Sequence, residues 1–219
     1  MRRIVTSVSA AAALALFAAA PAPAPAQTPF RAHLTNGQEV PGPVVPTLSD
    51  GVTPRPISFG HAKLVLNAAQ TQLFFTLMVY NIDFTGSQTA DVNDNLRAAH
   101  IHAPAPPGSN AGVVWGFIGT PFNDTNPTNS VITPFATGVG GKVVGRWDAP
   151  EGNGATTLTA QVANLRAGKA YLNFHTAQYP GGEIRGQIQV VPEPVSMLLL
   201  GTGLAGVGAA ARRRKRTAA

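Results

Sequence analysis

Short runs in which apolar and polar residues alternate dominate the middle of the chain. No stretch there keeps the 3.6-residue period of a helix, whereas alternation with period two gives a strand one apolar face. Segments rich in Gly, Pro, Asn and Thr separate the runs, as they do between strands. The predicted strands cover residues 30–34, 61–66, 72–80, 113–118, 130–136, 142–147, 156–163, 171–176 and 184–190.

The arrangement of these runs predicts an all-β fold. Residues 72–80 are apolar on both faces, which suits a central strand. Residues 171–176 and 184–190 flank Pro180-Gly181-Gly182, so we expect them to form a closing hairpin. About eight or nine strands at this spacing predict an antiparallel Greek-key β-sandwich or barrel. An N-terminal signal peptide and a C-terminal hydrophobic helix would flank it.

The first 26 residues have the order of an export signal. Arg2 and Arg3 precede an apolar segment, residues 4–20, and a Pro-Ala repeat follows it. Ala24-Pro25-Ala26 fits the small-residue pattern of cleavage sites, so we expect cleavage after Ala26. The chain is therefore expected to be exported.

The last segment, residues 192–219, has the order of a surface-sorting tail. A short motif, an apolar run over 195–211 and a basic cluster follow one another. The run rises about 1.5 Å per residue and covers roughly 25 Å of a hydrocarbon core about 30 Å thick. It therefore suits a transient stay in the inner membrane, and a lasting anchor is the alternative. The tail residues on which this prediction rests are Pro192, Glu193, Pro194, Arg212, Arg213 and Arg214.

Charge is concentrated in these two ends. The chain carries 16 basic and 10 acidic residues, but seven of the basic residues lie in the signal and the tail. Residues 27–194 keep nine basic and ten acidic residues, a net charge of about −1. Without a basic excess, nucleic-acid binding is disfavoured. The chain has no cysteine, so the domain must be held together by its core instead of by disulfides.

Three strings within the predicted domain resemble those of the CHRD domain, which is named after chordin. They are Phe30-x-Ala-x-Leu-x-x-Gly-Gln-Glu-Val-Pro41, Ala99-His-Ile-His102, and Tyr171-x-Asn-x-His-Thr176 with Pro180-Gly-Gly-Glu-Ile-Arg-Gly-Gln187. The tail resembles the PEP-CTERM signal of Gram-negative bacteria. After the signal peptide over 1–26, the resemblance implies a compact β domain over 27–191 and a sorting tail over 192–219. It also implies cleavage near Pro194 by an exosortase-like transpeptidase, but no general reaction for the domain.

Polar residues share faces of the expected strands in the second and third strings. In an extended strand, residues i and i+2 point to the same side. The polar side chains on the faces opposite to the core are His100, His102, Asn173, His175, Glu183 and Arg185. If the strand of residues 100–102 lies beside the closing hairpin, three imidazoles, a carboxylate and a guanidinium converge.

Two interpretations of this cluster differ in what the histidines do. In a polar network, they and Asn173 bond to the backbone, and Glu183 pairs with Arg185 or another cation. In a metal site, they bind one Zn, Cu, Ni or Fe ion, and Glu183 is a fourth ligand or an outer group. The candidate imidazole ligands are His100, His102 and His175.

A third interpretation is a polar groove for carbohydrate, with outward aromatic residues such as Tyr171 and Tyr179. His-x-His in an exported sandwich is also similar to the copper–zinc superoxide dismutases. Those enzymes need more histidines and usually a disulfide, whereas this chain has five histidines and no cysteine. A dinuclear enzyme site is therefore not expected.

These patterns together predict an exported, surface-sorted and non-enzymatic β domain. We expect it to act as a structural or adhesive module at the cell surface or in an exopolysaccharide matrix. The alternative is a metal-binding module, with redox chemistry as an option. The expected partners are an exosortase-like enzyme, the inner membrane through residues 195–211, and an extracellular polysaccharide. No cofactor is expected beyond a single transition-metal ion.

Overall fold

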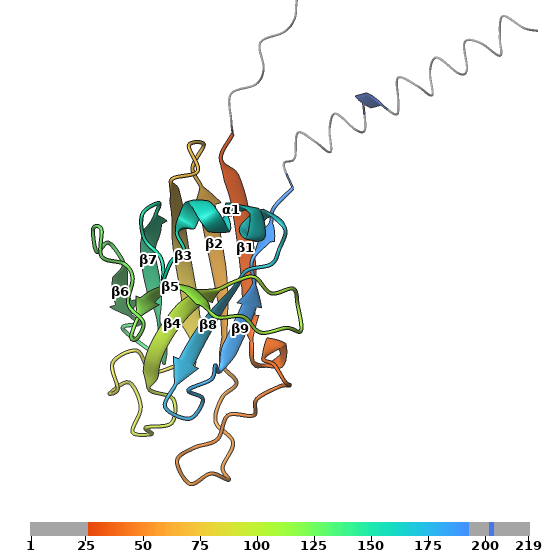
Figure 1. Cartoon of the computed structure of the whole chain (residues 1–219). Coiled ribbons are helices and arrows are strands. Elements are labelled where there is room, and N and C mark those ends of the chain that lie inside the picture. Colours follow the sequence, from red (N-terminus) through yellow and green to blue (C-terminus); the bar gives the residue numbers. More distant parts are fainter. Residues whose placement is uncertain (1–25, 193–201, 204–219) are drawn as a thin grey trace, which may run out of the picture.

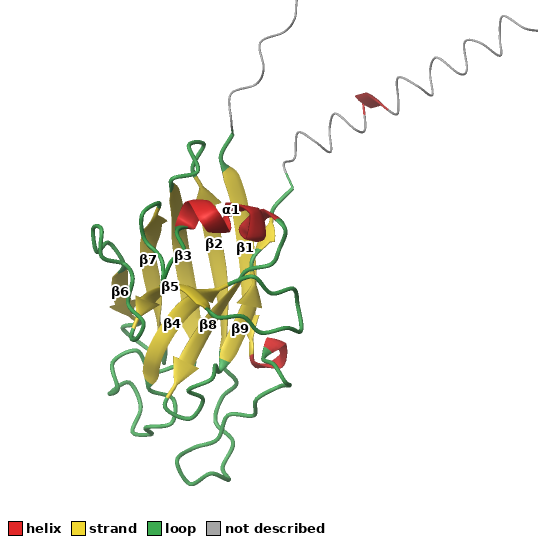
Figure 2. Ribbon diagram, viewed as in Figure 1, coloured by secondary structure: helices red, strands yellow, loops and turns green. Residues whose placement is uncertain are grey.

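One antiparallel sheet, curled on itself, makes up most of the protein in a computed structural model that describes residues 26–192 and 202–203 (Figure 1). Within residues 26–192, the helical elements are η1 (Asn36–Gln38) and α1 (Leu158–Arg166) (Figure 2). The strands are β1 (Thr28–Thr35), β2 (Phe59–Leu66), β3 (Gln72–Tyr80), β4 (Leu96–His102), β5 (Val113–Ile118), β6 (Val131–Pro134), β7 (Gly140–Asp148), β8 (Tyr171–Thr176), β9 (Ile184–Gln187) and β10 (Gln189–Val190).

Neighbouring strands in the sheet are often far apart in the sequence. The order is β5-β4-β8-β9-β1-β2-β3-β7-β6, and β10 pairs with β1. Consecutive strands pair antiparallel in β1–β2, β2–β3, β4–β5, β6–β7 and β8–β9. The connections after β3, β5 and β7 cross between the two halves of the sheet. The predicted all-β, antiparallel fold is confirmed, and so is the closing hairpin.

Aromatic side chains fill the space that the curled sheet encloses. The rings of Trp115 on β5 and Trp147 on β7 stack with centroids 5.5 Å apart, and both side chains are fully buried. Phe75 on β3 packs edge-on against Trp115 at 5.7 Å. Offset and edge-to-face pairs of this kind stabilise a core beyond the area they bury. The core therefore joins the two halves of the sheet across its concave side.

The central strand and the last strand differ in detail from the prediction. β3 lies between β2 and β7, as a central strand should. Only one of its faces is buried, because Phe74 on the other face is 43% exposed. In a regular strand over residues 184–190, Val190 would share the core face of Ile184 and Ile188. It is instead 37% exposed, because β10 pairs at the rim of the domain.

Residues 156–163 were predicted as a strand, but most of them lie in helix α1. The buried apolar residues of this helix are Leu158, Val162 and Leu165, which are spaced four and three residues apart. That spacing places them on one helical face, and all three join the core. Ala160 would share the inward face of Leu158 and Val162 in a strand, but in the helix it is exposed. The short segment fitted both periods, and tertiary packing selected the helix.

The start of α1 depends on a side-chain cap. The Thr157 hydroxyl accepts a hydrogen bond from the Ala160 backbone N–H at 3.3 Å. We expect Thr157→Ala to lower the free energy of unfolding by about 1 kcal/mol, because that N–H loses its partner. Urea denaturation measures the change. The matched control is Thr159→Ala in the same turn, which is exposed and should change stability by less than about 0.5 kcal/mol. Equal losses in both variants would contradict the capping role.

The two predicted end segments fall mostly outside the described residues. Ala26 is described, but residues 1–25 of the signal peptide are not. Pro192 is described, whereas Glu193, Pro194 and the basic cluster of the tail are not. Of the predicted hydrophobic helix over 195–211, only residues 202–203 are described. Within the described ranges, no helix has both the length and the apolar character that crossing a membrane requires.

Candidate functional site

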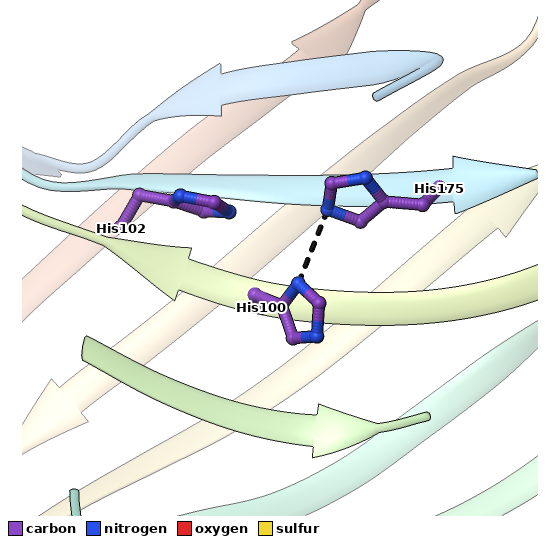
Figure 3. Close-up of side chains that lie close together, drawn as sticks. All are labelled: His100, His102 and His175. Atoms are coloured by element: carbon purple, nitrogen blue, oxygen red, sulfur yellow. Dashed lines mark hydrogen bonds between the residues drawn. The ribbon is translucent and has the colours of Figure 1, made fainter. Parts of the chain in front are cut away.

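Three histidines from two neighbouring strands meet on the polar side of the sheet. β4 and β8 pair antiparallel, with Ala98 opposite His175 and His100 opposite Asn173. One ring nitrogen from each of His100, His102 and His175 lies within 4.8 Å of the other two. Figure 3 shows the three rings side by side above β4 and β8. The adjacency on which the predicted convergence depended is therefore present.

Backbone carbonyls orient two of the rings. Nδ1 of His102 lies 3.0 Å from the Ala111 oxygen, and Nδ1 of His175 lies 2.9 Å from the Pro180 oxygen. Because a carbonyl oxygen only accepts, each Nδ1 donates its hydrogen and each Nε2 keeps a lone pair. Nε2 of His102 is buried and has no partner among the described residues. A histidine that binds a metal usually donates its second N–H in this way.

The position of the third ring, that of His100, is compatible both with a hydrogen-bonded network and with a metal site. Nδ1 of His100 lies 3.2 Å from Nε2 of His175 (Figure 3). Two nitrogens on one tetrahedral zinc ion, each bonded at about 2.0–2.1 Å, would be about 3.3 Å apart. Without an ion, Nδ1–H of His100 donates to the Nε2 lone pair of His175. The same rings can thus form a polar network or share a metal ion.

Burial keeps the three imidazoles neutral. Desolvation, with smaller effects of His175 and His102, lowers the pKa of His100 from 6.5 to about 4. Desolvation likewise lowers the pKa of His102 to about 4, against the opposing effect of its bond to Ala111. The pKa of His175 is also lowered, mainly by burial. Neutral imidazole is the form that binds metal ions, so no proton has to leave before an ion binds near pH 7.

The metal-free protein should lose stability on acidification. Unfolded histidines take up a proton near pH 6.5, whereas folded His100 and His102 do so only near pH 4. The unfolded state binds more protons between these values, so stability falls as the pH drops from about 6.5 to about 4. The loss is on the order of 3 kcal/mol or less for each histidine. Urea denaturation of chelator-treated protein from pH 8 to pH 4 measures it.

The Glu39 carboxyl changes the stability with pH in the opposite direction to the histidines, so replacing it provides a control. Desolvation, opposed by Arg185 and Asn173, raises the pKa of this carboxyl from 4.5 to about 7. The folded state keeps a proton that the unfolded state loses, so this contribution to stability declines as the pH rises from about 4.5 to about 7. Glu39→Gln should therefore steepen the loss of stability on acidification. A stability that does not change between pH 8 and pH 4 in both proteins would contradict the assignment.

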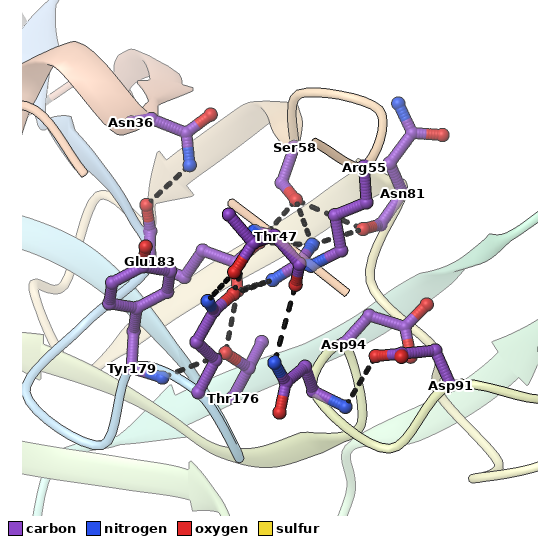
Figure 4. A network of polar contacts seen from close by, with 12 residues as sticks. Asn36, Thr47, Arg55, Ser58, Asn81, Asp91, Asp94, Thr176, Tyr179 and Glu183 are labelled. Carbon is purple, nitrogen blue, oxygen red and sulfur yellow. Dashed lines mark hydrogen bonds and ion pairs between the residues drawn. The ribbon is translucent and has the colours of Figure 1, made fainter. Parts of the chain in front are cut away.

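Glu183, predicted as a fourth ligand or an outer group, does not belong to the cluster that the three histidines form. Its oxygens lie 2.9 Å and 2.5 Å from the guanidinium nitrogens of Arg55. They also accept hydrogen bonds from the hydroxyls of Ser58 and Thr176 (Figure 4). The cation that pairs with Glu183 is therefore Arg55 and not Arg185. Both members of this ion pair are almost fully buried.

Arg185 reaches the histidines only through an aromatic ring. Its guanidinium carbon lies 3.6 Å from the centroid of the Tyr171 ring. That ring stacks on His102, with centroids 4.7 Å apart and planes within 6° of parallel. Tyr171 is 2% exposed, so it is not the outward aromatic residue that the carbohydrate interpretation required. The Tyr179 ring is half-buried, and its hydroxyl donates to the Val45 carbonyl.

The polar faces that were predicted to point outward are buried under loops. Glu183 is 0% and Arg185 1% exposed. The loop after β4 supplies Asn110, whose Oδ1 accepts from Arg185 at 3.2 Å. The Pro-rich segment 41–56 supplies Arg55. No pattern in the sequence marks Arg55, because a lone arginine among prolines carries no periodicity.

The same face holds Glu39, which lies in the first of the three strings. The side chain is 7% exposed, and Oε1 has no partner among the described residues. A side chain at Gly182 would collide with both Asn173 and the Glu39 carboxylate, so the two lie against the same backbone. Asn173 belongs to the polar network as predicted by position, opposite both His100 and Arg185 in the sheet. Residues from all three strings thus meet in one buried polar layer.

Two known families match this chain. Residues 30–188 match the CHRD domain, and residues 190–215 match the PEP-CTERM protein-sorting motif. The second match spans Pro192, Glu193 and Pro194 as well as the arginines from Arg212 to Arg214. No curated protein and no solved structure matches the chain.

Proposed function

We propose that this chain, which belongs to the CHRD domain family and carries a PEP-CTERM sorting motif, is a non-catalytic cell-surface protein that holds one transition-metal ion. The two matches make it an exported and sorted protein. Sorting through this motif implies processing by an exosortase. Once outside the cell, the domain would carry the metal ion.

The observation that supports metal binding is the convergence of three buried and neutral imidazoles. Their ring nitrogens lie within 4.8 Å of one another, and two of the rings donate their other N–H to backbone carbonyls. Burying Nε2 of His102 without a partner costs free energy, and a bound ion would supply that partner. Nitrogen donors of this type suit Zn, Cu, Ni or Fe. His100, His102 and His175 are the proposed ligands.

The domain's place outside the cell supports a second part of the proposal. We infer that the sorted domain serves as a structural or adhesive module in the cell envelope or in an exopolysaccharide matrix. The basic cluster and the apolar run of the tail fit a transient passage through the inner membrane during sorting. The signals direct the chain outward, and residues 27–194 have a net charge of about −1, so nucleic acid is disfavoured as a partner.

Elemental analysis of the chain recovered from the cell surface tests both parts of the proposal. Mass spectrometry of the untagged protein should find about one Zn, Cu, Ni or Fe ion per chain. A chain truncated after Pro194 should leave the surface fraction but keep its metal. Wild-type protein that contains no metal and takes up none on titration would refute the metal site. Unchanged surface retention of the truncated chain would refute the sorting role.

A further inference from the structure

A row of aromatic rings crosses the outer face of the sheet, on the side that faces away from the core. His33 on β1 meets His61 on β2 with ring centroids 4.2 Å apart, and His61 meets Phe59 at 6.1 Å. Phe59 stacks on Tyr80 of β3 at 4.7 Å, with the planes within 13° of parallel. Tyr80 in turn contacts Phe135 at 5.1 Å. We call these five residues the ring row.

The ring row is accessible to solvent, which is unusual for large apolar rings on a sheet. Phe59 is 37% exposed, and His33 and His61 are exposed as well. The solvent face of an antiparallel sheet is normally polar. Here the rings are continuous over three neighbouring strands, which lie about 4.8 Å apart. Contiguous apolar surface of this kind commonly marks a binding site.

The same face carries cations without matching carboxylates. Arg31 lies directly opposite Lys63 across β1 and β2, and Lys142 lies on β7. None of the three forms an ion pair with another described residue. Asp148 is the one acidic residue in β1, β2, β3 and β7, and it pairs with Arg146 at 2.9 Å. Positive charge is therefore concentrated on this face, although residues 27–194 have a net charge of about −1.

A hollow lies where the cations and the ring row meet. It has a volume of about 440 Å³ and is lined by Arg31 and Lys63, by His33 and His61, and by Gln189 of β10. This volume is in the range of sites that accept small molecules or single units of a polymer. It lies on the convex side of the sheet, away from the three buried histidines, so it is a separate site.

We propose that this face binds an acidic polysaccharide. Sugar rings stack on the ring row, and carboxylate groups along the polymer pair with Arg31, Lys63 and Lys142. A linear polymer fits a row that extends over several strands, whereas a single small anion would use only the hollow. The inference rests on the proposed function only in that the domain lies outside the cell, and it does not depend on the metal.

Binding of the full chain to polygalacturonate, measured in mild detergent, tests this inference. The charge variant is Arg31→Glu, Lys63→Glu and Lys142→Glu together, and we expect it to bind at least tenfold more weakly. Its matched control is Arg97→Glu, Arg166→Glu and Lys169→Glu, which changes three exposed cations outside this face by the same total charge. The control should bind within twofold of wild type. The basic tail is identical in all variants, so it contributes equally to each measurement.

A ring variant and two alternative ligands separate this proposal from its rivals. Phe59→Ser should also weaken binding at least tenfold, with an unchanged circular dichroism spectrum showing that the fold is kept. Neutral dextran should bind to none of the proteins. Equal losses in both charge variants, or full binding by Phe59→Ser, would overturn the proposal. So would binding to anionic phosphatidylglycerol vesicles or to single-stranded DNA in preference to polygalacturonate.

Discussion

Replacing His175 with alanine should reduce bound metal from about one ion per chain to less than about a tenth of an ion. His175 contributes an Nε2 whose lone pair is fixed by the bond from Nδ1 to the Pro180 carbonyl. This Nε2 lies 3.2 Å from Nδ1 of His100. Removing the His175 side chain therefore leaves only two of the three proposed nitrogen donors. Elemental analysis and competition with a chromogenic chelator measure the stoichiometry and the affinity.

The chain supplies its own controls, because its two remaining histidines lie elsewhere. His33 and His61 form an exposed pair on the outer face. His33→Ala and His61→Ala should keep about one ion per chain, since neither residue belongs to the buried cluster. Near-UV circular dichroism of His175→Ala distinguishes loss of the site from loss of the fold. If His175→Ala folds normally and still binds one ion, the three-histidine site is wrong.

Replacing Arg55 with methionine should lower the free energy of unfolding by about 3–5 kcal/mol. The change leaves the Glu183 carboxylate, which is 0% exposed, without its cationic partner. Hydroxyl bonds from Ser58 and Thr176 remain, but they do not neutralise a buried charge. The cost of an unpaired buried carboxylate therefore dominates. Denaturation in urea at pH 7 gives the size of the loss.

Two further variants show whether the loss comes from the uncompensated charge. Adding Glu183→Gln to Arg55→Met removes that charge and should recover most of the stability. Arg146→Ala breaks an ion pair whose arginine side chain is 31% exposed and should cost no more than about 1 kcal/mol. If the double variant is as unstable as Arg55→Met alone, packing of the arginine side chain explains the effect instead.

Most strands could be predicted because their pattern is local. The apolar run of residues 72–80 coincides with β3, and that of residues 113–118 coincides with β5. A strand with one buried face repeats every two residues, whatever its neighbours are. A predicted strand was wrong where the segment was short enough to fit both the strand period and the helix period. Residues 156–163 alternate, yet contacts of Leu158, Val162 and Leu165 with the core stabilise α1 instead.

The sequence predicted the strand face on which each residue of the candidate site lies, but not the residues that it contacts. That His100 and His102 share a face follows from their spacing alone. Their meeting with His175 required β4 and β8 to be neighbours, although 75 residues separate His100 from His175. The carboxylate that was expected beside them, that of Glu183, instead pairs with Arg55, which lies 128 residues away in the sequence. Nothing local to Glu183 could have selected that partner.

The sequence alone determined the sorting signals, the all-β class and the strand face on which the polar residues of the second and third strings lie, because these depend on order and spacing within short segments. The tertiary structure decided which strands are neighbours, which loops cover the polar layer and where positive charge gathers. Arg31, Lys63 and Lys142 form one cationic face only because β1, β2, β3 and β7 are consecutive in the sheet. Burial, which lowers the pKa values of the histidines and raises that of Glu39, likewise depends on loops that fold over them from distant parts of the chain. Contacts of this kind are set by the packing of the whole domain.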